Sequence, residues 1–264
     1  KNFTIYRPQA EIENCLSYKW TEIIFEDSRG KLWFGSKGGL SVFNPLNETF
    51  GQYHHNGQNK ATLSNDTITA INEGPDGSIW IGTLAGLNRI EPKFGNAERV
   101  SLIGYNNTFS SSQIFDIVSE PDGDMWVGTE DGLFFASEKN PVFSLLASKT
   151  ENLNQAVYTL AVNNNTLWAG TDKGLVSYDL ITGLEILFEI GLCGDNAEYE
   201  NKIEKLVHDK QGKIWAGTPG GLFLFNHKNG EFICLAEARD ATQSLSVNTA
   251  KPTCLDSRDN LWYG

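Results

Sequence analysis

Six tryptophans recur along this chain at a nearly constant interval. The spacings between successive copies are 47, 46, 42, 47 and 47 residues, for Trp33, Trp80, Trp126, Trp168, Trp215 and Trp262. A fixed period of this length is typical of proteins built from one repeated structural unit. The repeat constrains the fold more strongly than any single motif does, because every copy has to form the same unit.

The residues around each tryptophan recur as well. An apolar residue precedes it, and glycine follows two positions later in all six copies. In five copies a Ser or Thr comes next, and Gly-Leu occupies the sixth and seventh positions after Trp, as in Gly86-Leu87. Three positions before Trp stands Gly, replaced by Asn165 and Asp259 in two copies. These residue types tolerate a positive φ, so this position is predicted to be the left-handed residue that closes a hairpin.

Short apolar segments on both sides of these turns predict strands. One lies upstream of the turn, for example residues 68–71, a second carries the tryptophan, and a third begins at the Gly-Leu pair. A fourth carries Phe50, Phe143 or Phe232, each seventeen residues after its Trp. Four short strands in about 46 residues are the pattern of a β-propeller blade. Without helical periodicity, helical solenoids and βαβ units are disfavoured, and a β-sandwich is a weaker competitor.

The sequence therefore predicts an all-β protein in which residues 1–264 form a single partial propeller of four-stranded antiparallel blades. Complete blades are expected at about residues 21–54, 66–106, 112–148, 155–190 and 201–236. A split blade is expected from residues 248–264 together with a fourth strand at residues 3–6. Because the split blade lacks a third strand, we expect a piece of a longer propeller of about seven blades. A closed ring of six blades, one of them defective, is the alternative.

The joint pattern of one repeat is specific. It reads Glu26-Asp27-x-x-Gly30-x-Leu32-Trp33-Phe34-Gly35-Ser36-x-Gly38-Gly39-Leu40, and residues 75–88 and 209–222 match it equally well. This unit resembles the two-component regulator propeller repeat, and the resemblance covers essentially the whole chain. Asn163-Asn164-Asn165 and Asp259 depart from the usual turn residues. Proteins with this repeat look like extracytoplasmic sensor regions of hybrid histidine kinases in Bacteroidetes.

The resemblance implies both a function and a setting. It implies a periplasmic part of an inner-membrane receptor that senses an oligosaccharide and regulates glycan utilisation, with no catalysis in this segment. The protein partners it implies are the remaining propeller blades and a downstream β-sandwich of the same parent chain, with the full receptor forming a homodimer. No kinase motif lies in these residues, so the signalling role comes from the resemblance alone.

Charge and hydropathy exclude other partners. The net charge is −12, from 21 basic and 33 acidic residues. Such an acidic surface repels a phosphate backbone, so no nucleic-acid partner is expected. No stretch reaches the roughly 18 apolar residues that span a bilayer, so no direct membrane contact is expected either.

Candidate binding residues are sought where the repeats differ, because a residue that every blade shares serves the blade. The six repeat tryptophans are therefore assigned a structural role, supplying apolar area between neighbouring sheets. In propellers, the turns between strands two and three and the connections to the next blade emerge on one face. The predicted ligand-binding residues on that face are Trp20, Lys37, Glu130, Asp131, Asp172 and Lys173. Such groups can hydrogen-bond and stack on a sugar; ordinary solvated loop polarity is the alternative for each.

Signatures of catalysis, metal binding and cofactor binding are weak. There is no Gly-x-Ser-x-Gly and no Gly-x-x-x-x-Gly-Lys-Ser/Thr. His54-His55 lacks a third ligand at a suitable spacing, so neither a metal nor a cofactor is expected. The four cysteines allow three pairings, although Cys234 and Cys254 fit small buried hydrophobes better. The alternative function is a propeller enzyme, either similar to streptogramin lyase or a glycosidase that uses loop carboxylates.

Overall fold

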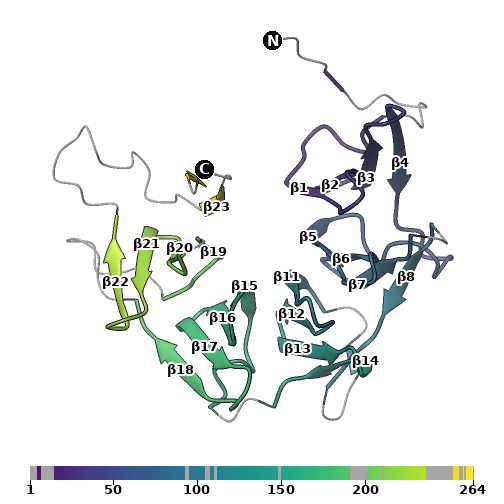
Figure 1. Ribbon diagram of the computed structural model, residues 1–264. Coiled ribbons are helices and arrows are strands. Elements are labelled where there is room, and N and C mark those ends of the chain that lie inside the picture. The colour runs from purple at the N-terminus through teal and green to yellow at the C-terminus, as the bar shows by residue number, and fades with distance from the viewer. Residues whose placement is uncertain are drawn as a thin grey trace. The chain divides into compact units, whose positions relative to one another are not determined.

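The computed structural model describes residues 5–6, 15–92, 95–104, 108–109, 112–147, 150–190, 201–209, 211–235, 252–255, 258 and 260–263. Every regular element in these residues is a β-strand (Figure 1). The described residues contain no helix with the length and apolar character needed to cross a membrane. The chain divides into two compact units. Unit 1 comprises Lys1–Thr129 and Phe134–Leu145, and unit 2 comprises Glu130–Leu133 and Leu146–Gly264.

Unit 1 holds three sheets, which we call blades 1 to 3. In each of them four strands that are consecutive within the blade lie side by side in chain order. Blade 1 consists of β1 (Ile23–Glu26), β2 (Leu32–Ser36), β3 (Gly39–Asn44) and β4 (Thr49–Tyr53). Blade 2 consists of β5 (Ile68–Glu73), β6 (Ile79–Thr83), β7 (Gly86–Ile90) and β8 (Ala97–Val100). Blade 3 consists of β11 (Ile114–Ser119), β12 (Met125–Thr129), β13 (Gly132–Ser137) and β14 (Asn140–Leu145). Two short strands, β9 (Leu102–Ile103) and β10 (Thr108–Phe109), extend the third sheet beyond β14.

Unit 2 repeats the same arrangement. Blade 4 consists of β15 (Val157–Asn163), β16 (Thr166–Thr171), β17 (Gly174–Asp179) and β18 (Glu185–Phe188). Blade 5 consists of β19 (Lys205–His208), β20 (Ile214–Thr218), β21 (Gly221–Asn226) and β22 (Glu231–Cys234). The strands β23 (Pro252–Leu255) and β24 (Leu261–Tyr263) form a two-stranded antiparallel sheet.

The turn between the first two strands of a blade follows the prediction in four blades and departs from it in blade 4. Gly30 and Gly77, for example, have φ values of 75° and 76°, in the left-handed region that glycine adopts without a Cβ penalty. In blade 4 the left-handed residue is Asn164, with φ 53°, and the prediction for Asn165 is wrong. The reason is a shorter turn, because Asn163 pairs directly with Thr166 and leaves two residues to reverse the chain.

Within unit 1, neighbouring blades pack through the tryptophan-bearing face of one and the opposite face of the next. Trp33 is buried in a cluster with Ile71 and Ile81 of blade 2. Trp80 of blade 2 is buried in the same way against Ile117 and Val127 of blade 3. Large aromatic rings contribute much of the apolar area that such sheet-on-sheet contacts remove from water.

The same packing holds in unit 2. Trp168 of blade 4 lies against Leu206 and Ala216 of blade 5. In contrast, Trp262 on β24 is 60% exposed.

Candidate functional site

The predicted binding residues of blade 1 lie at the end of the strands where β2 turns into β3. Lys37 stands in that turn, and its Nζ lies 3.3 Å from Oε1 of Glu22, the residue just before β1. Trp20 is 67% exposed, and Nζ of Lys19 lies 6.0 Å from the centroid of its ring. The segment that leads into β1 therefore presents a solvent-facing aromatic ring and an ion pair at the same end of the blade.

Tyr18 fixes this entry segment against the β2–β3 turn. A Cβ placed on Gly38 would come within 2.6 Å of Cδ2 of Tyr18. The turn and the tyrosine therefore touch closely, and glycine is required because a side chain would push them apart.

The corresponding end of unit 2 carries a denser group of polar side chains. Asp172 and Lys173 stand exposed in the β16–β17 turn. The hydroxyl of Tyr158, on β15, donates a hydrogen bond to Oδ2 of Asp172 at 3.2 Å. Nζ of Lys202 lies 4.2 Å from the centroid of the Tyr158 ring and 3.3 Å from Oε1 of Glu204. We call Tyr158, Asp172, Lys202 and Glu204 the Tyr158 cluster.

The Tyr158 cluster combines two carboxylates, an ammonium group and an aromatic ring. At 4.2 Å the ammonium group is within the range in which the face of an aromatic ring attracts a cation. All four side chains are exposed or half-buried, so a ligand can reach their polar atoms. The cluster offers donors and acceptors within one small area, together with a ring on which an apolar surface can pack.

The other two predicted residues, Glu130 and Asp131, occupy the β12–β13 turn. Glu130 is exposed and Asp131 is half-buried. They belong to unit 2 by their contacts, although the strands that flank them lie mainly in unit 1.

Sequence reasoning missed Glu22, Tyr158, Lys202 and Glu204. Glu22 and Glu204 both stand eleven residues before their repeat tryptophan. Each donates its backbone N–H to the glycine carbonyl two residues after that tryptophan, at 2.9 Å, and each forms an ion pair with a lysine at 3.3 Å. A shared glutamate at the start of strand one was therefore a visible signal. The contact between Tyr158 and Lys202 had no such signal, since their distance depends on how blades 4 and 5 pack.

The adjacent histidines and Cys234, which the sequence raised as candidates for a metal site or for disulfide pairing, contact other groups of the protein. Nδ1 of His55 donates to the carbonyl oxygen of Leu63 at 2.8 Å, and Nδ1 of His54 lies 3.9 Å from Oδ1 of Asp66. Within the described residues, no three His, Cys, Asp or Glu side chains are grouped to hold a metal ion. Cys234 is disulfide-bonded, so the interpretation of this residue as a simple buried hydrophobe is wrong.

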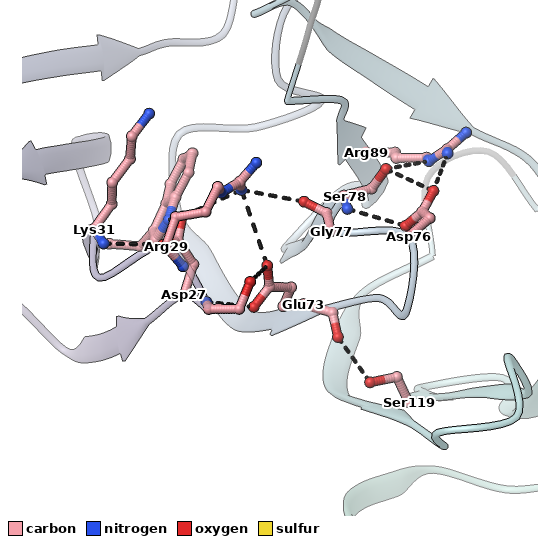
Figure 2. Close-up of polar contacts among 11 residues, drawn as sticks. Asp27, Arg29, Lys31, Glu73, Asp76, Gly77, Ser78, Arg89 and Ser119 are labelled. Carbon is pink, nitrogen blue, oxygen red and sulfur yellow. Dashed lines mark hydrogen bonds and ion pairs between the residues drawn. The ribbon is translucent and has the colours of Figure 1, made fainter.

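The opposite end of the strands in unit 1 carries a polar network that joins three blades (Figure 2). Oγ of Ser28 donates to Oε1 of Glu73 at 2.7 Å, and the Arg29 guanidinium donates to the carbonyl oxygen of Gly77 at 3.1 Å. Oγ of Ser119 donates to the carbonyl oxygen of Glu73 at 2.8 Å. Glu73 of blade 2 thus contacts blades 1 and 3, and its polar groups are used in holding the blades together.

The carboxylates of these turns have shifted pKa values with opposite signs. Burial alone would raise the pKa of Asp27, but hydrogen bonds from the Trp33 indole and the Lys31 amide, with the Arg29 charge, hold it below its usual value. Burial raises the pKa of Glu120, and the nearby charges of Asp122 and Asp124 add to the effect while the Trp126 indole opposes it. Both carboxylates bind an indole of their own blade, which indicates a structural role.

Comparison with known proteins supports the repeat and the fold. Residues 62–85 and 108–131 match the family model of the two component regulator propeller. No curated protein matches the sequence. The extracellular domain of BT3049 from B. thetaiotaomicron, described as a hybrid two component system, is similar with a TM-score of 0.70 and 20% identity, over 98% of this chain and 40% of that one.

Two further solved structures share the fold. The extracellular domain of BT4673 from B. thetaiotaomicron, described as a one component system, has a TM-score of 0.70 and 21% identity, over 91% of this chain and 32% of that one. Streptogramin B lyase has a TM-score of 0.62 and 16% identity, over 91% of this chain and 74% of that one. The chain spans less than half the length of the two extracellular domains. Its fold is a β-propeller of four-stranded antiparallel blades, and two segments of its sequence are similar to the two component regulator propeller repeat.

Proposed function

We propose that this chain is a ligand-sensing segment of an extracytoplasmic, periplasmic receptor in a two-component system, and that it binds an oligosaccharide without catalysis. The repeats and the likeness to extracellular domains of such systems support the setting. The observation that carries the binding site is the Tyr158 cluster, where a turn carboxylate, a tyrosine and a lysine–glutamate pair meet.

The chemistry of the Tyr158 cluster suits a sugar. Hydroxyl groups of a sugar both donate and accept hydrogen bonds, so Asp172 and Glu204 can accept from them while Lys202 and Lys173 donate. The Tyr158 ring offers a surface for the C–H face of a sugar ring. Exposed Trp20 offers a second aromatic surface at the corresponding end of blade 1.

The test is calorimetry of the complete extracytoplasmic region against a panel of glycan fragments. For the fragment that binds, we expect Lys202→Met and Tyr158→Phe each to weaken affinity about tenfold, as loss of one hydrogen bond or charge contact does. Trp20→Ala and Lys173→Ala test the sequence-predicted residues in the same assay. Lys228→Met is the matched control, because Lys228 is exposed in the β21–β22 turn at the other end of blade 5.

Two outcomes would contradict the proposal. Unchanged affinity in Lys202→Met, Tyr158→Phe and Lys173→Ala would place the ligand elsewhere. Conversion of the fragment into product would favour the enzyme alternative, to which the fold likeness of streptogramin B lyase gives its support. Product analysis after long incubation with purified protein distinguishes binding from turnover.

We also propose that further blades of the parent chain pack on blade 1. Ile24 is 68% exposed, whereas Ile71 and Ile117, which stand at the same register position of blades 2 and 3, are 9% and 3% exposed. The Tyr6 ring lies 5.1 Å from the Phe43 ring, on the face where a preceding blade would contribute its fourth strand. In the parent chain, we expect Ile24→Ser to destabilise the fold as Ile71→Ser does. A negligible effect of Ile24→Ser would show that this face remains in solvent.

The downstream β-sandwich and the homodimer remain parts of the same proposal. The homodimer is tested by measuring the oligomeric state of the complete extracytoplasmic region by sedimentation. A strictly monomeric region, with or without the glycan, would contradict the dimer.

A further inference from the structure

Cys234, on the outer strand of blade 5, forms a disulfide bond whose partner the sequence leaves open. Of the other three cysteines, Cys15 is a buried thiol whose Sγ donates to the carbonyl oxygen of Leu16 at 3.4 Å. The partner of Cys234 within this chain is therefore Cys193 or Cys254. The place of Cys234 in its blade decides between the two.

Cys254 stands too far across the sheets to be the partner. It lies on β23, which contacts β19 and β20, the first two strands of blade 5. Cys234 lies on β22, and β21 separates β22 from β20. Neighbouring strands are about 4.8 Å apart, so roughly 10 Å separate β22 from β20 alone. A disulfide joins Cα atoms that are at most about 7 Å apart, which excludes Cys254.

In each of the other four blades, the outer strand contacts the connection that leads into that same blade. In blade 1, Nε2 of Gln52 donates to the carbonyl oxygen of Cys15 at 2.8 Å. In blade 2, the Arg99 guanidinium donates to the carbonyl oxygen of Leu63 at 3.0 Å. In blade 3 the contact is the pairing of β14 with β9, and in blade 4 it is a hydrogen bond from the segment ahead of β15 to the first residue of β18. The repeated unit thus uses its outer strand to hold the chain that enters it.

Cys234 occupies the register position of Gln52 and Arg99. Each of the three pairs with the residue that directly follows the Gly-Leu motif of the third strand, which in blade 5 is Phe223. A side chain at this position reaches the entering connection in blades 1 and 2. The same position in blade 5 therefore favours a partner in the connection that enters blade 5.

Cys193 belongs to that connection and is within reach. The connection runs between β18 and β19, and Cys193 itself lies outside the described residues. Ile190, three positions before it, packs against the same apolar cluster as Cys234. Three residues span at most about 11 Å, so Cys193 can meet Cys234 without leaving this side of the blade.

The same connection carries Lys202 of the Tyr158 cluster. The backbone N–H of Ile190 donates to Oδ1 of Asn201 at 3.1 Å, so the residues on either side of residues 191–200 lie together. Asn201 directly precedes Lys202, whose Nζ lies over the Tyr158 ring. One hydrogen bond contributes only about 1 kcal/mol net, so on its own it holds the ends of such a loop weakly. A covalent cross-link adds a constraint that does not open with thermal motion.

We propose that Cys234 is bonded to Cys193, and that this disulfide positions Lys202 in the Tyr158 cluster. The bond ties the connection into blade 5 to β22, so the chain arrives at Asn201 already held in place. A lysine that is ordered before a ligand arrives loses less conformational entropy on binding. Only this last step rests on the proposed oligosaccharide function.

Peptide mapping of the complete extracytoplasmic region, digested without reduction, tests the pairing. We expect a cross-linked pair of peptides that contain Cys193 and Cys234, which separates on reduction. A cross-link between Cys234 and Cys254, or recovery of Cys234 as a thiol, would overturn the proposal.

Lysine acetylation followed by mass spectrometry tests the positioning without any sugar. The Lys202 side chain is 25% exposed and forms an ion pair with Glu204. We expect Cys193→Ser/Cys234→Ser to raise the acetylation rate of Lys202 at least about threefold, because local opening exposes the amine. Cys254→Ser is the matched control and should leave the rate unchanged. Wild type reduced with dithiothreitol provides the same comparison if the double variant does not fold, and an unchanged rate would contradict the positioning role.

Affinity for the oligosaccharide shows whether the disulfide acts through Lys202. For the fragment that binds, we expect Cys193→Ser/Cys234→Ser to weaken affinity about threefold in wild type and to have no further effect in Lys202→Met. Equal losses in both backgrounds would mean that the disulfide does not act through Lys202. If no fragment binds, the proposed function fails, whereas the peptide map and the acetylation rates still decide this inference.

Discussion

The indole nitrogen of Trp33 donates a hydrogen bond to Oδ2 of Asp27 at 3.0 Å, six residues earlier in the chain. The same relationship recurs in blade 3, where the Trp126 indole donates to Oε1 of Glu120 at 2.8 Å. A buried indole N–H that lacks an acceptor costs free energy, so a carboxylate at this position stabilises the repeat tryptophan. In blades 1 and 3 the repeat unit therefore includes a polar partner as well as the tryptophan, Asp27 in the first and Glu120 in the second.

Replacing Asp27 should destabilise unit 1. The Asp27 carboxylate also accepts the backbone amides of Arg29 and Lys31, at 3.0 and 2.9 Å, so it supports both the turn and the ring. We expect Asp27→Asn to lower the free energy of unfolding by about 1–3 kcal/mol at neutral pH. Urea unfolding of the variant and the wild type measures this, with the exposed Glu98→Gln as the control for removal of one charge.

The effect of Asp27 should depend on pH. Because the native fold holds the Asp27 pKa below its usual value, its contribution is present above the unfolded pKa of about 3.9 and is lost as the pH falls through the native pKa. The stability difference between wild type and Asp27→Asn should therefore shrink below about pH 4. A difference that stays constant down to the acid transition would show that the charge of Asp27 is irrelevant.

Glu120 should show the opposite pH dependence. Its pKa is raised in the fold, so its contribution is present below the unfolded pKa of about 4.3 and is lost as the pH rises through the native pKa. Glu120→Gln keeps an acceptor for Trp126 and removes the ionisation. Between the unfolded and the native pKa of Glu120, we expect wild type to lose stability as the pH rises, whereas Glu120→Gln should not. Urea unfolding at a series of pH values measures this difference. Glu231→Gln, in unit 2, is the control.

The indole of Trp215 provides a contrast within the same repeat. Its Nε1 is buried and has no hydrogen-bond partner in the described residues. Asp209, six residues earlier, instead accepts the backbone amides of Gln211 and Lys213, at 2.9 and 2.8 Å.

Substitution by phenylalanine should therefore cost more at Trp33 than at Trp215. Both changes remove a similar amount of ring, but Trp33→Phe also leaves the buried Asp27 carboxylate without its indole donor. We expect Trp33→Phe to destabilise by about 1–3 kcal/mol more than Trp215→Phe, by thermal or urea unfolding. Equal costs would mean that the indole–carboxylate bond contributes nothing to stability.

A methyl group at Gly82 should disturb the contact between blades 2 and 3. A Cβ at this position would lie 2.7 Å from Cγ2 of Ile114 and 3.1 Å from Cβ of Ala70. We expect Gly82→Ala to destabilise by about 1–3 kcal/mol, as overpacking of a close contact does. Gly57→Ala is the matched control, since its nearest neighbour would be Nε2 of His55 at 3.8 Å. Similar midpoints in urea for the two variants would contradict a tight contact at Gly82.

The strands and most turns were predictable because their causes are local. The strand β6 (Ile79–Thr83) and the start of β7 at Gly86 follow the Trp-x-Gly-Thr and Gly-Leu pattern directly. Asn164 and Asn165 show where this reasoning ends, because both can adopt positive φ and only the pairing of Asn163 with Thr166 decides between them. The extra strands β9 and β10 lie in an interval where the repeat has no fixed residue.

The candidate sites were predictable only in part. The loop positions of Asp172 and Lys173 followed from the repeat, because the residues between Thr171 and Gly174 must form the turn. Their surroundings did not follow, since Lys202 lies in the connection to the next blade.

The sequence by itself determined the repeating unit, its strand order and its tight turns. Hydrophobic alternation and residues that permit positive φ act over a few neighbouring positions, and the repetition reinforces the same choice in every copy. Only the tertiary structure decided which polar groups meet, as Tyr158 does with Lys202 and Asp27 with the Trp33 indole. Such contacts depend on turn geometry and on the packing of one blade against the next, and a few ångströms separate a hydrogen bond from none.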